Sequence, residues 1–364
     1  MDFLARTCKE LGFDEVHIDR YGSLTATMIG TKAGPHLLFD GHIDTVGVEN
    51  RSVWHHDPYQ VEIADGLLYG RGTSDMKGAV CAMLVAVSTY AKQTNHHFGG
   101  NISVSATVCE ECFEGIAARL VTERCKPDMV IVGEATACKL AIGQRGRAEI
   151  VVETYGTSCH SSNPEKGSNA ALHMMHLLPY LEKIDIPHDP VLGKGIMVLT
   201  DLISHPYPGR SVLPNRCRAT FDRRLLCGET ESSVLSTIEK AIENAKQKNP
   251  ALEARAYLAE GSMQCYTGEE ISAVRFFPAW LMEAGHPMVK TGQKALRVAG
   301  LSDELSHYSF CTNASHFCAE AKLPTLGFGP SFEELAHTAD EHVSLEQLDL
   351  AYRGYLSLIS HFCP

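Results

Sequence analysis

The sequence lacks several features that would assign it to a large class of proteins. No run of five or more basic residues occurs, and acidic residues outnumber basic ones, 44 to 32, so binding to nucleic acid or to an anionic membrane is not indicated. No apolar run approaches the roughly 20 residues needed to cross a bilayer. The first residues, MDFLARTCKELGF, contain neither a basic nor an apolar leader region, and the 13 cysteines are an odd number. We therefore expect a cytoplasmic protein with reduced thiols and small-molecule partners.

Sequence signatures of two other kinds of site are missing or incomplete. No G-x-S-x-G segment occurs, which argues against a serine hydrolase with a nucleophile elbow. Cys109 and Cys112 form a C-x-x-C motif, but no second such motif completes a zinc ribbon and no thioredoxin-like pattern surrounds it. A redox pair of these two cysteines and an acidic surface turn remain alternative interpretations of the CEEC segment.

The order of hydrophobic patterns predicts two domains in the 364 residues, of which 44% are hydrophobic. From residue 1 to 147, short apolar runs alternate with helical patterns, as in α/β proteins. The expected elements are strands at 37–42, 102–108 and 129–134 and helices at 75–93 and 114–124. The same pattern resumes between 259 and 364 with the apolar run PTLGFGP. We therefore expect one α/β domain built from these two segments.

Residues 148–258 follow a different pattern. The segment RAEIVVETYG alternates apolar and acidic residues, which is typical of a strand with one solvent-facing side. Further expected elements are a helix at 169–182, an amphipathic helix around 235–242, and strands at 195–203, 216–225 and 252–258. The resulting order, β-α-β-β-α-β, predicts a ferredoxin-like α+β domain inserted into the α/β domain.

Acidic and imidazole side chains collect where the predicted strands end. In open α/β sheets, ligands bind beyond the carboxyl ends of the strands. A single histidine at such a place is more often a solvated or hydrogen-bonded residue than a metal ligand, but several coincidences favour one shared site. The candidates are His42, Asp75, Glu110, Glu111, Glu134 and His337.

This donor set suits two zinc ions, with Co²⁺ or Mn²⁺ as substitutes. Zinc takes nitrogen and oxygen donors, and a catalytic zinc keeps three protein ligands and one open position. Two histidines, two glutamates and one bridging aspartate give each ion three ligands. We assign one ion to His42, Asp75 and Glu134, and the other to Asp75, Glu111 and His337.

Two further carboxylates have roles near these ligands. Asp44 lies two positions after His42 on the same strand face, so its carboxylate can accept the imidazole N–H and fix the tautomer. Glu110 is next to the ligand Glu111 and points to the other side of the chain. We therefore expect Glu110 to be the general base that takes a proton from the attacking water.

Taken in order, the segments GHIDTV, GRGTSDMKGAV, CEE, GEAT and HTADEHV, between residues 41 and 343, resemble the di-zinc peptidase and deacylase family. This family includes acetylornithine deacetylase, succinyl-diaminopimelate desuccinylase, aminoacylases, dipeptidases and carboxypeptidases. The segments GQRGRAEI and FCTNAS resemble most closely the hydrolases associated with selenium metabolism. The resemblance implies a three-layer α/β/α catalytic domain and an inserted ferredoxin-like lid that forms a homodimer.

The resemblance also implies roles for residues outside the metal ligands. His160, in the lid segment GTSCHSSNPEKG, would donate to the oxyanion of the neighbouring subunit's site, and Arg224 would hold a substrate carboxylate. A helix-entry histidine and a strand-face arginine are the alternatives. Asn313, in CTNASHF, stands where many relatives have Gly-Gly-Thr-Asp, and we take it as a substrate-binding candidate. Ser211 replaces an asparagine found in many relatives, so substrate recognition departs from the family pattern.

The function expected from these residues is metal-dependent hydrolysis of the amide bond of a small N-acyl amino acid, as in acetylornithine deacetylase. A carboxylate on the substrate is expected because Arg224 is suited to bind one. The alternatives are a dipeptidase or N-carbamoyl amino acid hydrolase of the same family, and a non-catalytic binding protein with this fold. Retention of Glu110 argues against the last alternative, because a protein without catalysis has no chemical need for a base.

Overall fold

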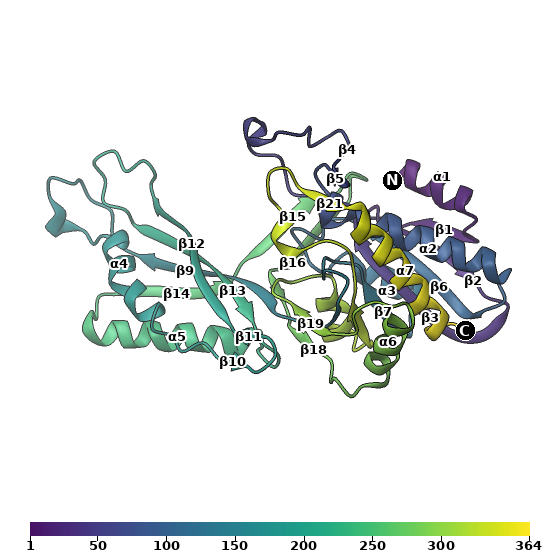
Figure 1. The fold of residues 1–364 in the computed structure, drawn as a ribbon. Helices are drawn as coiled ribbons and strands as arrows, with labels where there is room; N and C mark the ends of the chain where they lie inside the picture. The colour runs from purple at the N-terminus through teal and green to yellow at the C-terminus, as the bar shows by residue number, and fades with distance from the viewer. The chain divides into compact units, whose positions relative to one another are not determined.

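The computed structural model describes residues 1–364, which form two compact units (Figure 1). The larger unit contains residues 1–144, 262–272 and 280–364. The inserted unit contains residues 145–261 and 273–279. The larger unit is thus assembled from three separate parts of the chain.

A nine-stranded mixed sheet forms the centre of the larger unit. Strands β6, β3, β7 and β20 are parallel to one another, whereas β1 and β2 at one edge and β8 and β18 near the other are joined by antiparallel pairing. A ninth strand, β19, pairs with β8 in parallel. In spatial order, the strands are β1 (Glu15–Ile18), β2 (Leu24–Ile29), β6 (Gly99–Thr107), β3 (Lys32–His42), β7 (Met129–Val132), β20 (Thr325–Gly327), β8 (Leu140–Gln144) and β18 (Trp280–Leu281), with β19 (Leu305–Tyr308) beside β8.

Helices cover both faces of this sheet, because successive side chains of its strands point to opposite sides. Leu37 and Phe39 of β3 belong to one core together with Tyr355, whereas Leu38 between them belongs to a second core together with Phe317. The first face carries α1 (Asp2–Leu11), α2 (Gly78–Thr94), α6 (Pro287–Val298) and α7 (Leu345–Phe362), and the second carries α3 (Ala118–Cys125) and the short helix η4 (Ser315–Glu320). The expected three-layer α/β/α class is confirmed.

Smaller elements surround the sheet of the larger unit. A three-stranded sheet consists of β21 (His342–Ser344), β5 (Leu67–Tyr69) and β4 (Glu62–Ala64). The hairpin of β15 (Glu260–Gln264) and β16 (Glu270–Val274) has its turn in the larger unit. Short helical turns are η1 (Arg51–Val53), η2 (Thr73–Lys77) and η5 (Glu333–Leu335). None of the helices combines the length and the apolar composition that a membrane crossing requires.

The inserted unit is a five-stranded antiparallel sheet with two helices on one face. Four of its strands lie in the order β12-β13-β9-β14. The short strand β17 (Phe276–Phe277) also pairs with β9. In chain order the elements are β9 (Gly146–Tyr155), η3 (Pro164–Lys166), α4 (Ala170–Leu181), the hairpin β10 (His188–Asp189) and β11 (Gly193–Lys194), β12 (Ile196–His205), β13 (Arg216–Leu225), α5 (Glu231–Lys248) and β14 (Glu253–Leu258). One apolar core joins α4 and α5 to the sheet. This β-α-β-β-α-β arrangement is the ferredoxin-like one.

Candidate metal centre

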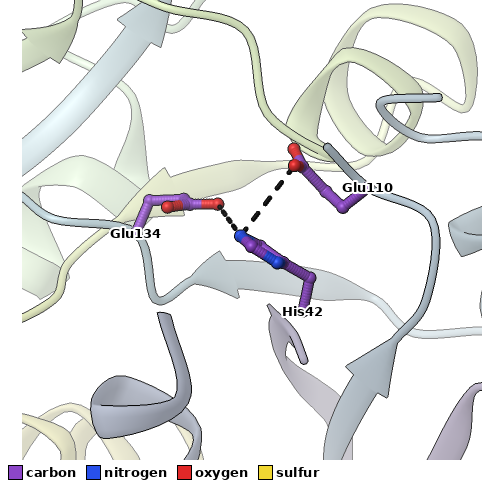
Figure 2. A group of neighbouring side chains, drawn as sticks. All are labelled: His42, Glu110 and Glu134. Carbon is purple, nitrogen blue, oxygen red and sulfur yellow. Dashed lines mark ion pairs between the residues drawn. The ribbon is translucent and has the colours of Figure 1, made fainter. Parts of the chain in front are cut away.

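His42 lies at the centre of a cluster of carboxylates in the larger unit. It is the last residue of β3 and is only 1% exposed. Its Nε2 atom is 2.9 Å from Asp75 Oδ1, 3.4 Å from Glu134 Oε1 and 3.9 Å from Glu110 Oε2. Figure 2 shows Glu110 and Glu134 converging on this nitrogen from two sides. The carboxyl ends of three neighbouring strands, β3, β6 and β7, thus bring these residues together.

His337 approaches the same cluster from the C-terminal part of the chain. Its Nε2 atom is 2.9 Å from Glu111 Oε2 and 3.1 Å from Asp75 Oδ2. Asp75 therefore lies between the two histidines, with one carboxylate oxygen facing each of them. The side chain of His337 is 52% exposed, in contrast to buried His42, so this side of the cluster is open to solvent.

The position of Asp75 depends on a buried residue that the sequence analysis did not single out. Glu341, which is fully buried, accepts the backbone N–H groups of Gly72, Ser74 and Asp75 at 2.9 to 3.0 Å with one carboxylate oxygen. Its other oxygen pairs with Arg71 at 2.6 Å. These bonds hold η2 in place before α2 begins. The only sequence signal for Glu341 is its place in the HTADEHV segment.

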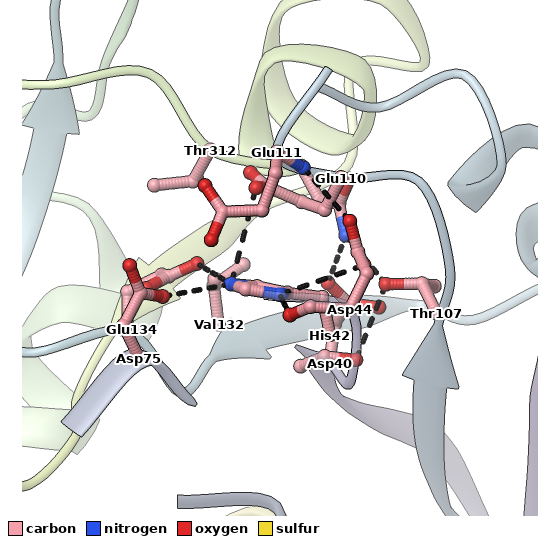
Figure 3. Close-up of polar contacts among 12 residues, drawn as sticks. Asp40, His42, Asp44, Asp75, Thr107, Glu110, Glu111, Val132, Glu134 and Thr312 are labelled. Carbon is pink, nitrogen blue, oxygen red and sulfur yellow. Dashed lines mark hydrogen bonds and ion pairs between the residues drawn. The ribbon is translucent and has the colours of Figure 1, made fainter. Parts of the chain in front are cut away.

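Asp44 orients His42 in a different way from the one expected (Figure 3). The Nδ1 atom of His42 is 2.9 Å from the backbone carbonyl of Asp44, whereas the Asp44 carboxylate is 3.6 Å away. The carbonyl can only accept, so it keeps a proton on Nδ1 and directs Nε2 toward the carboxylates. The Asp44 carboxylate instead accepts the backbone N–H of Glu111 at 3.1 Å, and Glu111 in turn accepts the backbone N–H of Val46 at 3.1 Å.

Burial and mutual repulsion shift the pKa values of the clustered groups. Burial raises the pKa of Glu110 well above its usual value, and burial together with the charge of Asp75 raises the pKa of Glu134 to about 7. Burial alone would lower the pKa of His42, but the charge of Glu110 and hydrogen bonds to neighbouring carboxylates raise it well above normal. Hydrogen bonds to Asp75 and Glu111 raise the pKa of His337 to about 10. The cluster has a strong preference for added positive charge.

The residues of this cluster fit divalent metal ions. Imidazole nitrogen and carboxylate oxygen are the donors that Zn²⁺, Mn²⁺ and Co²⁺ bind. Two groups of side chains bring their donor atoms close enough together to hold an ion. Within each group, all donor atoms lie within 4.8 Å of one another. One group is His42, Glu110 and Glu134, and the other is His42, Asp75 and Glu111. In addition, Glu110 Oε1 is buried without a hydrogen-bond partner. The first group contains Glu110, which the sequence analysis assigns as a base rather than a ligand.

His160 and Arg224 lie in the inserted unit and do not belong to the cluster described above. His160 is exposed, and its Nδ1 atom accepts the backbone N–H of Ser162 at 3.1 Å, which leaves the ring proton on Nε2. Arg224 is an ion-pair partner of Asp222, with a distance of 2.8 Å between Nε and Oδ1. Both side chains are at least partly accessible to a ligand.

Asn313 is not placed to bind substrate, contrary to the expectation from sequence. Its side chain is 2% exposed, and Nδ2 donates to Asp40 Oδ2 at 3.0 Å and to Thr107 Oγ1 at 2.9 Å. Its Oδ1 atom accepts the backbone N–H of Gly115 at 2.8 Å. Both amide hydrogens and the carbonyl oxygen are therefore used within the protein. We assign Asn313 a positioning role, because it joins the ends of β3 and β6 to the loop that follows Glu110 and Glu111.

Comparison with known proteins identifies the family to which the chain belongs. The family model described as peptidase family M20/M25/M40 matches residues 38–361. The chain belongs to peptidase family M20/M25/M40. This M20 chain is 33% identical over 339 residues to the uncharacterized protein YgeY of Escherichia coli K12, an alignment that covers 92% of this chain and 82% of YgeY. It is 27% identical over 366 residues to succinyl-diaminopimelate desuccinylase 2 of Ruegeria sp. TM1040, with 96% and 86% of the two chains covered.

The fold of the M20 chain is also found in solved structures. The crystal structure of aminopeptidase PepT from Bacillus cereus matches with a TM-score of 0.73 and 19% identity and covers 99% of this chain and 92% of PepT. The resemblance to the peptidase and deacylase family is thus confirmed, and the chain is a hydrolase of that family. The family generally binds divalent metal ions, and the M20 chain has a suitable cluster of donors.

Proposed function

We propose that this M20 chain is a di-metal amidohydrolase that cleaves the amide bond of a small N-acyl amino acid. The observation that carries the proposal is the position of Asp75, whose two carboxylate oxygens face His42 and His337 separately. An aspartate in this position is suited to bridge two cations. The similarity to a desuccinylase, whose substrate is an N-acyl amino acid by its name, supports an acyl amino acid as the substrate class.

One cation would be held by His42, Asp75 and Glu134, and the other by Asp75, Glu111 and His337. Bound divalent ions would polarise the scissile carbonyl and make water a better nucleophile at neutral pH. The protein's own contribution is to fix the ligands, through the Asp44 carbonyl behind His42 and the Asp44 carboxylate behind Glu111. Zinc is the ion that this donor set suits best, with cobalt or manganese as substitutes.

Glu110 would move the proton in this reaction. Its carboxylate is 6% exposed and lies 3.9 Å from His42 Nε2, and one of its oxygens has no hydrogen-bond partner. A buried carboxylate next to the reacting water can take its proton and pass it to the leaving amine. Burial raises the pKa of Glu110, which makes its carboxylate a stronger proton acceptor.

Two residues of the inserted unit would contact the substrate. The Ser162 N–H bond to His160 Nδ1 leaves Nε2–H as a donor, which is the tautomer needed to stabilise an oxyanion. Arg224 would bind the substrate carboxylate in exchange for its present partner, Asp222. Amides without a carboxylate should then be hydrolysed much more slowly than N-acyl amino acids.

The inserted unit would form a homodimer through its edge strand. Strand β12 lies at the edge of the sheet, and five of its apolar residues are 37 to 50% exposed: Ile196, Val198, Leu199, Leu202 and Ile203. An exposed apolar edge strand normally has a covering partner. Leu202→Glu should therefore give a monomer in analytical ultracentrifugation. The matched control Val191→Glu, at an exposed valine outside β12, should remain a dimer.

Two measurements test the proposed function. N-acetyl, N-succinyl and N-carbamoyl amino acids and dipeptides are assayed with zinc, cobalt and manganese, and metal-dependent turnover of an N-acyl amino acid is expected. Preferred turnover of a dipeptide or an N-carbamoyl amino acid would select one of the alternatives instead. Elemental analysis should find that Asp75→Ala loses both ions, whereas His337→Ala mainly weakens one. Two bound ions in Asp75→Ala would exclude the bridging role.

A further inference from the structure

Two buried cysteines meet beside the loop of the larger unit that carries Glu110 and Glu111. The Sγ atoms of Cys109 and Cys265 are 3.7 Å apart, although 156 residues separate them in the sequence. Each residue is 5% exposed. Cys109 therefore has a thiol neighbour that differs from Cys112, the partner considered from the C-x-x-C motif.

The Cys265 side of this contact is held in place by hydrogen bonds within the larger unit. Cys265 begins the turn between β15 and β16, and its N–H donates to the carbonyl of Glu269 at 2.8 Å. The next two residues fix the turn, because Tyr266 Oη donates to the carbonyl of Gly22 at 3.3 Å and Thr267 Oγ1 donates to the carbonyl of Arg20 at 2.7 Å. The two thiols thus remain neighbours in the folded chain.

Cys109 and Cys265 both line a small cavity. It has a volume of about 300 Å³, and its lining includes Cys109, Cys265 and Asp44, with Met263 and Tyr266 from the hairpin. Since one water molecule occupies about 30 Å³ of liquid, this volume admits a molecule of the size of hydrogen peroxide.

We propose that Cys109 and Cys265 are a modification site at which hydrogen peroxide forms a reversible disulfide. One thiol gives up its proton and attacks the peroxide as a thiolate. The O–O bond breaks, a sulfenic acid forms, and one water leaves. The second thiol then attacks the sulfenic sulfur, the S–S bond forms, and a second water leaves. The two thiols are oxidised by two electrons in total, and the peroxide is reduced to two water molecules. A dithiol reductant reverses the change by thiol–disulfide exchange.

The expected consequence for activity rests on the proposed function. A disulfide requires an S–S distance of about 2.05 Å, so the two sulfur atoms must approach each other by more than 1.5 Å. Cys109 is followed directly by Glu110 and Glu111, so part of this movement reaches the proposed base and a proposed ligand. A misplacement of about 1 Å in an active site can cost roughly 100-fold in rate. We therefore expect oxidation to lower kcat by about 10- to 100-fold.

Peptide mapping tests the modification, whatever the substrate is. The metal-loaded protein is treated with hydrogen peroxide, its remaining thiols are alkylated, and its proteolytic peptides are analysed by mass spectrometry. A peptide pair linked through Cys109 and Cys265 is expected, and dithiothreitol should remove it. Cys265→Ser and Cys265→Ala should both lack this linkage. The control variants Cys81→Ser and Cys227→Ser, at exposed cysteines, should keep it.

The activity measurement separates this inference from the proposed function. In the wild type, the linked peptide should form and dithiothreitol should restore turnover, whereas Cys265→Ser should keep its turnover after peroxide treatment. This result would support both the modification site and its effect on activity. Absence of the linked peptide from the peroxide-treated wild type overturns the modification site. Equal loss of turnover in the wild type and in Cys265→Ser overturns the role of this pair in regulation. A linked peptide in a protein that hydrolyses no amide leaves the site intact and removes only the proposed function.

Discussion

Replacing Asn313 with alanine should destabilise the larger unit without selectively weakening substrate binding. The substitution removes three hydrogen bonds, to Asp40, Thr107 and Gly115, and all three partners are in the interior. A buried polar group left without a partner costs about 1 to 3 kcal/mol. Allowing for partial relaxation, we expect a loss of about 3 to 6 kcal/mol in the free energy of unfolding. A loss of this size is a large part of the total stability of a typical domain.

Urea unfolding followed by tryptophan fluorescence is the appropriate assay. The protein has two tryptophans, Trp54 and Trp280, and both lie in the larger unit, so the signal reports on that unit alone. With a slope of roughly 3 kcal/mol per molar urea, the expected loss lowers the midpoint by about 1 to 2 M. Gln93→Ala removes an exposed amide from α2 and serves as the control, with a change within about 0.5 kcal/mol.

A milder variant keeps the test informative if Asn313→Ala does not fold. Thr107→Val removes one of the three partners and should lose about 1 to 2 kcal/mol. The reasoning would be refuted if Asn313→Ala unfolded at the wild-type urea concentration while its KM rose and its kcat stayed constant. That pattern belongs to a residue that binds substrate in the ground state.

The remaining predictions concern the proposed base, the lid histidine and one surface ion pair. Glu110→Gln should keep both metals while kcat falls by about 10² to 10⁴, and retention of more than about a tenth of the turnover would contradict its role as the base. If His160 acts across a dimer, mixing His160→Ala with Glu110→Ala subunits should restore activity, and no recovery despite proven subunit exchange would assign it to its own subunit or to no role. Burial raises the pKa of Glu320, but hydrogen bonds to His316 and Arg119 outweigh this effect and lower it to about 2. The free energy of unfolding of the wild type should exceed that of Glu320→Gln by about 1 kcal/mol, since this group is partly exposed. This difference should be fully present above about pH 4.5 and should disappear as the pH falls toward 2. Equal differences in the free energy of unfolding at pH 6 and at pH 3 would contradict the prediction.

The inserted unit could be predicted almost element by element from the sequence. Its strands alternate apolar and polar residues because only one sheet face is covered by helices, and this period is visible in single segments such as RAEIVVETYG. The strands predicted at 195–203 and 216–225 correspond to β12 and β13, and the helix predicted at 169–182 corresponds to α4. Strong local patterns of this kind need no long-range information.

The larger unit was predicted less completely because several of its elements carry weak local patterns. Strands β18 and β20 have two and three residues, too few for a period to be recognised, and β8 follows β7 after only seven residues. The helices α6 and α7 were not singled out, although α7 provides much of the core on one face of the sheet. Such elements are defined by their neighbours in space rather than by their own sequence.

The rule that ligands bind beyond the carboxyl ends of parallel strands predicts that the clustered side chains lie close together. The rule does not predict which hydrogen bonds these side chains make. The backbone carbonyl of Asp44, rather than its carboxylate, orients His42, and such a bond depends on local backbone geometry. The contact of Cys109 with Cys265 joins two segments far apart in the chain, and no local pattern announces it. The prediction that Asn313 binds substrate was wrong, because the sequence around an asparagine in a loop does not show whether its side chain is buried or exposed.

The assembly of the larger unit from three parts of the chain has a consequence for protein synthesis. Strand β20 pairs with both β7 and β8, yet it is made long after them, and α7, which packs on α2, is made later than β20. The inserted unit ends at residue 279, so all its residues leave the ribosome before β20 exists. The nascent chain therefore passes through a stage in which the inserted unit can fold while β7 and β8 expose unpaired edges. During that interval the growing chain is most exposed to aggregation, and a chaperone that covers strand edges would protect it.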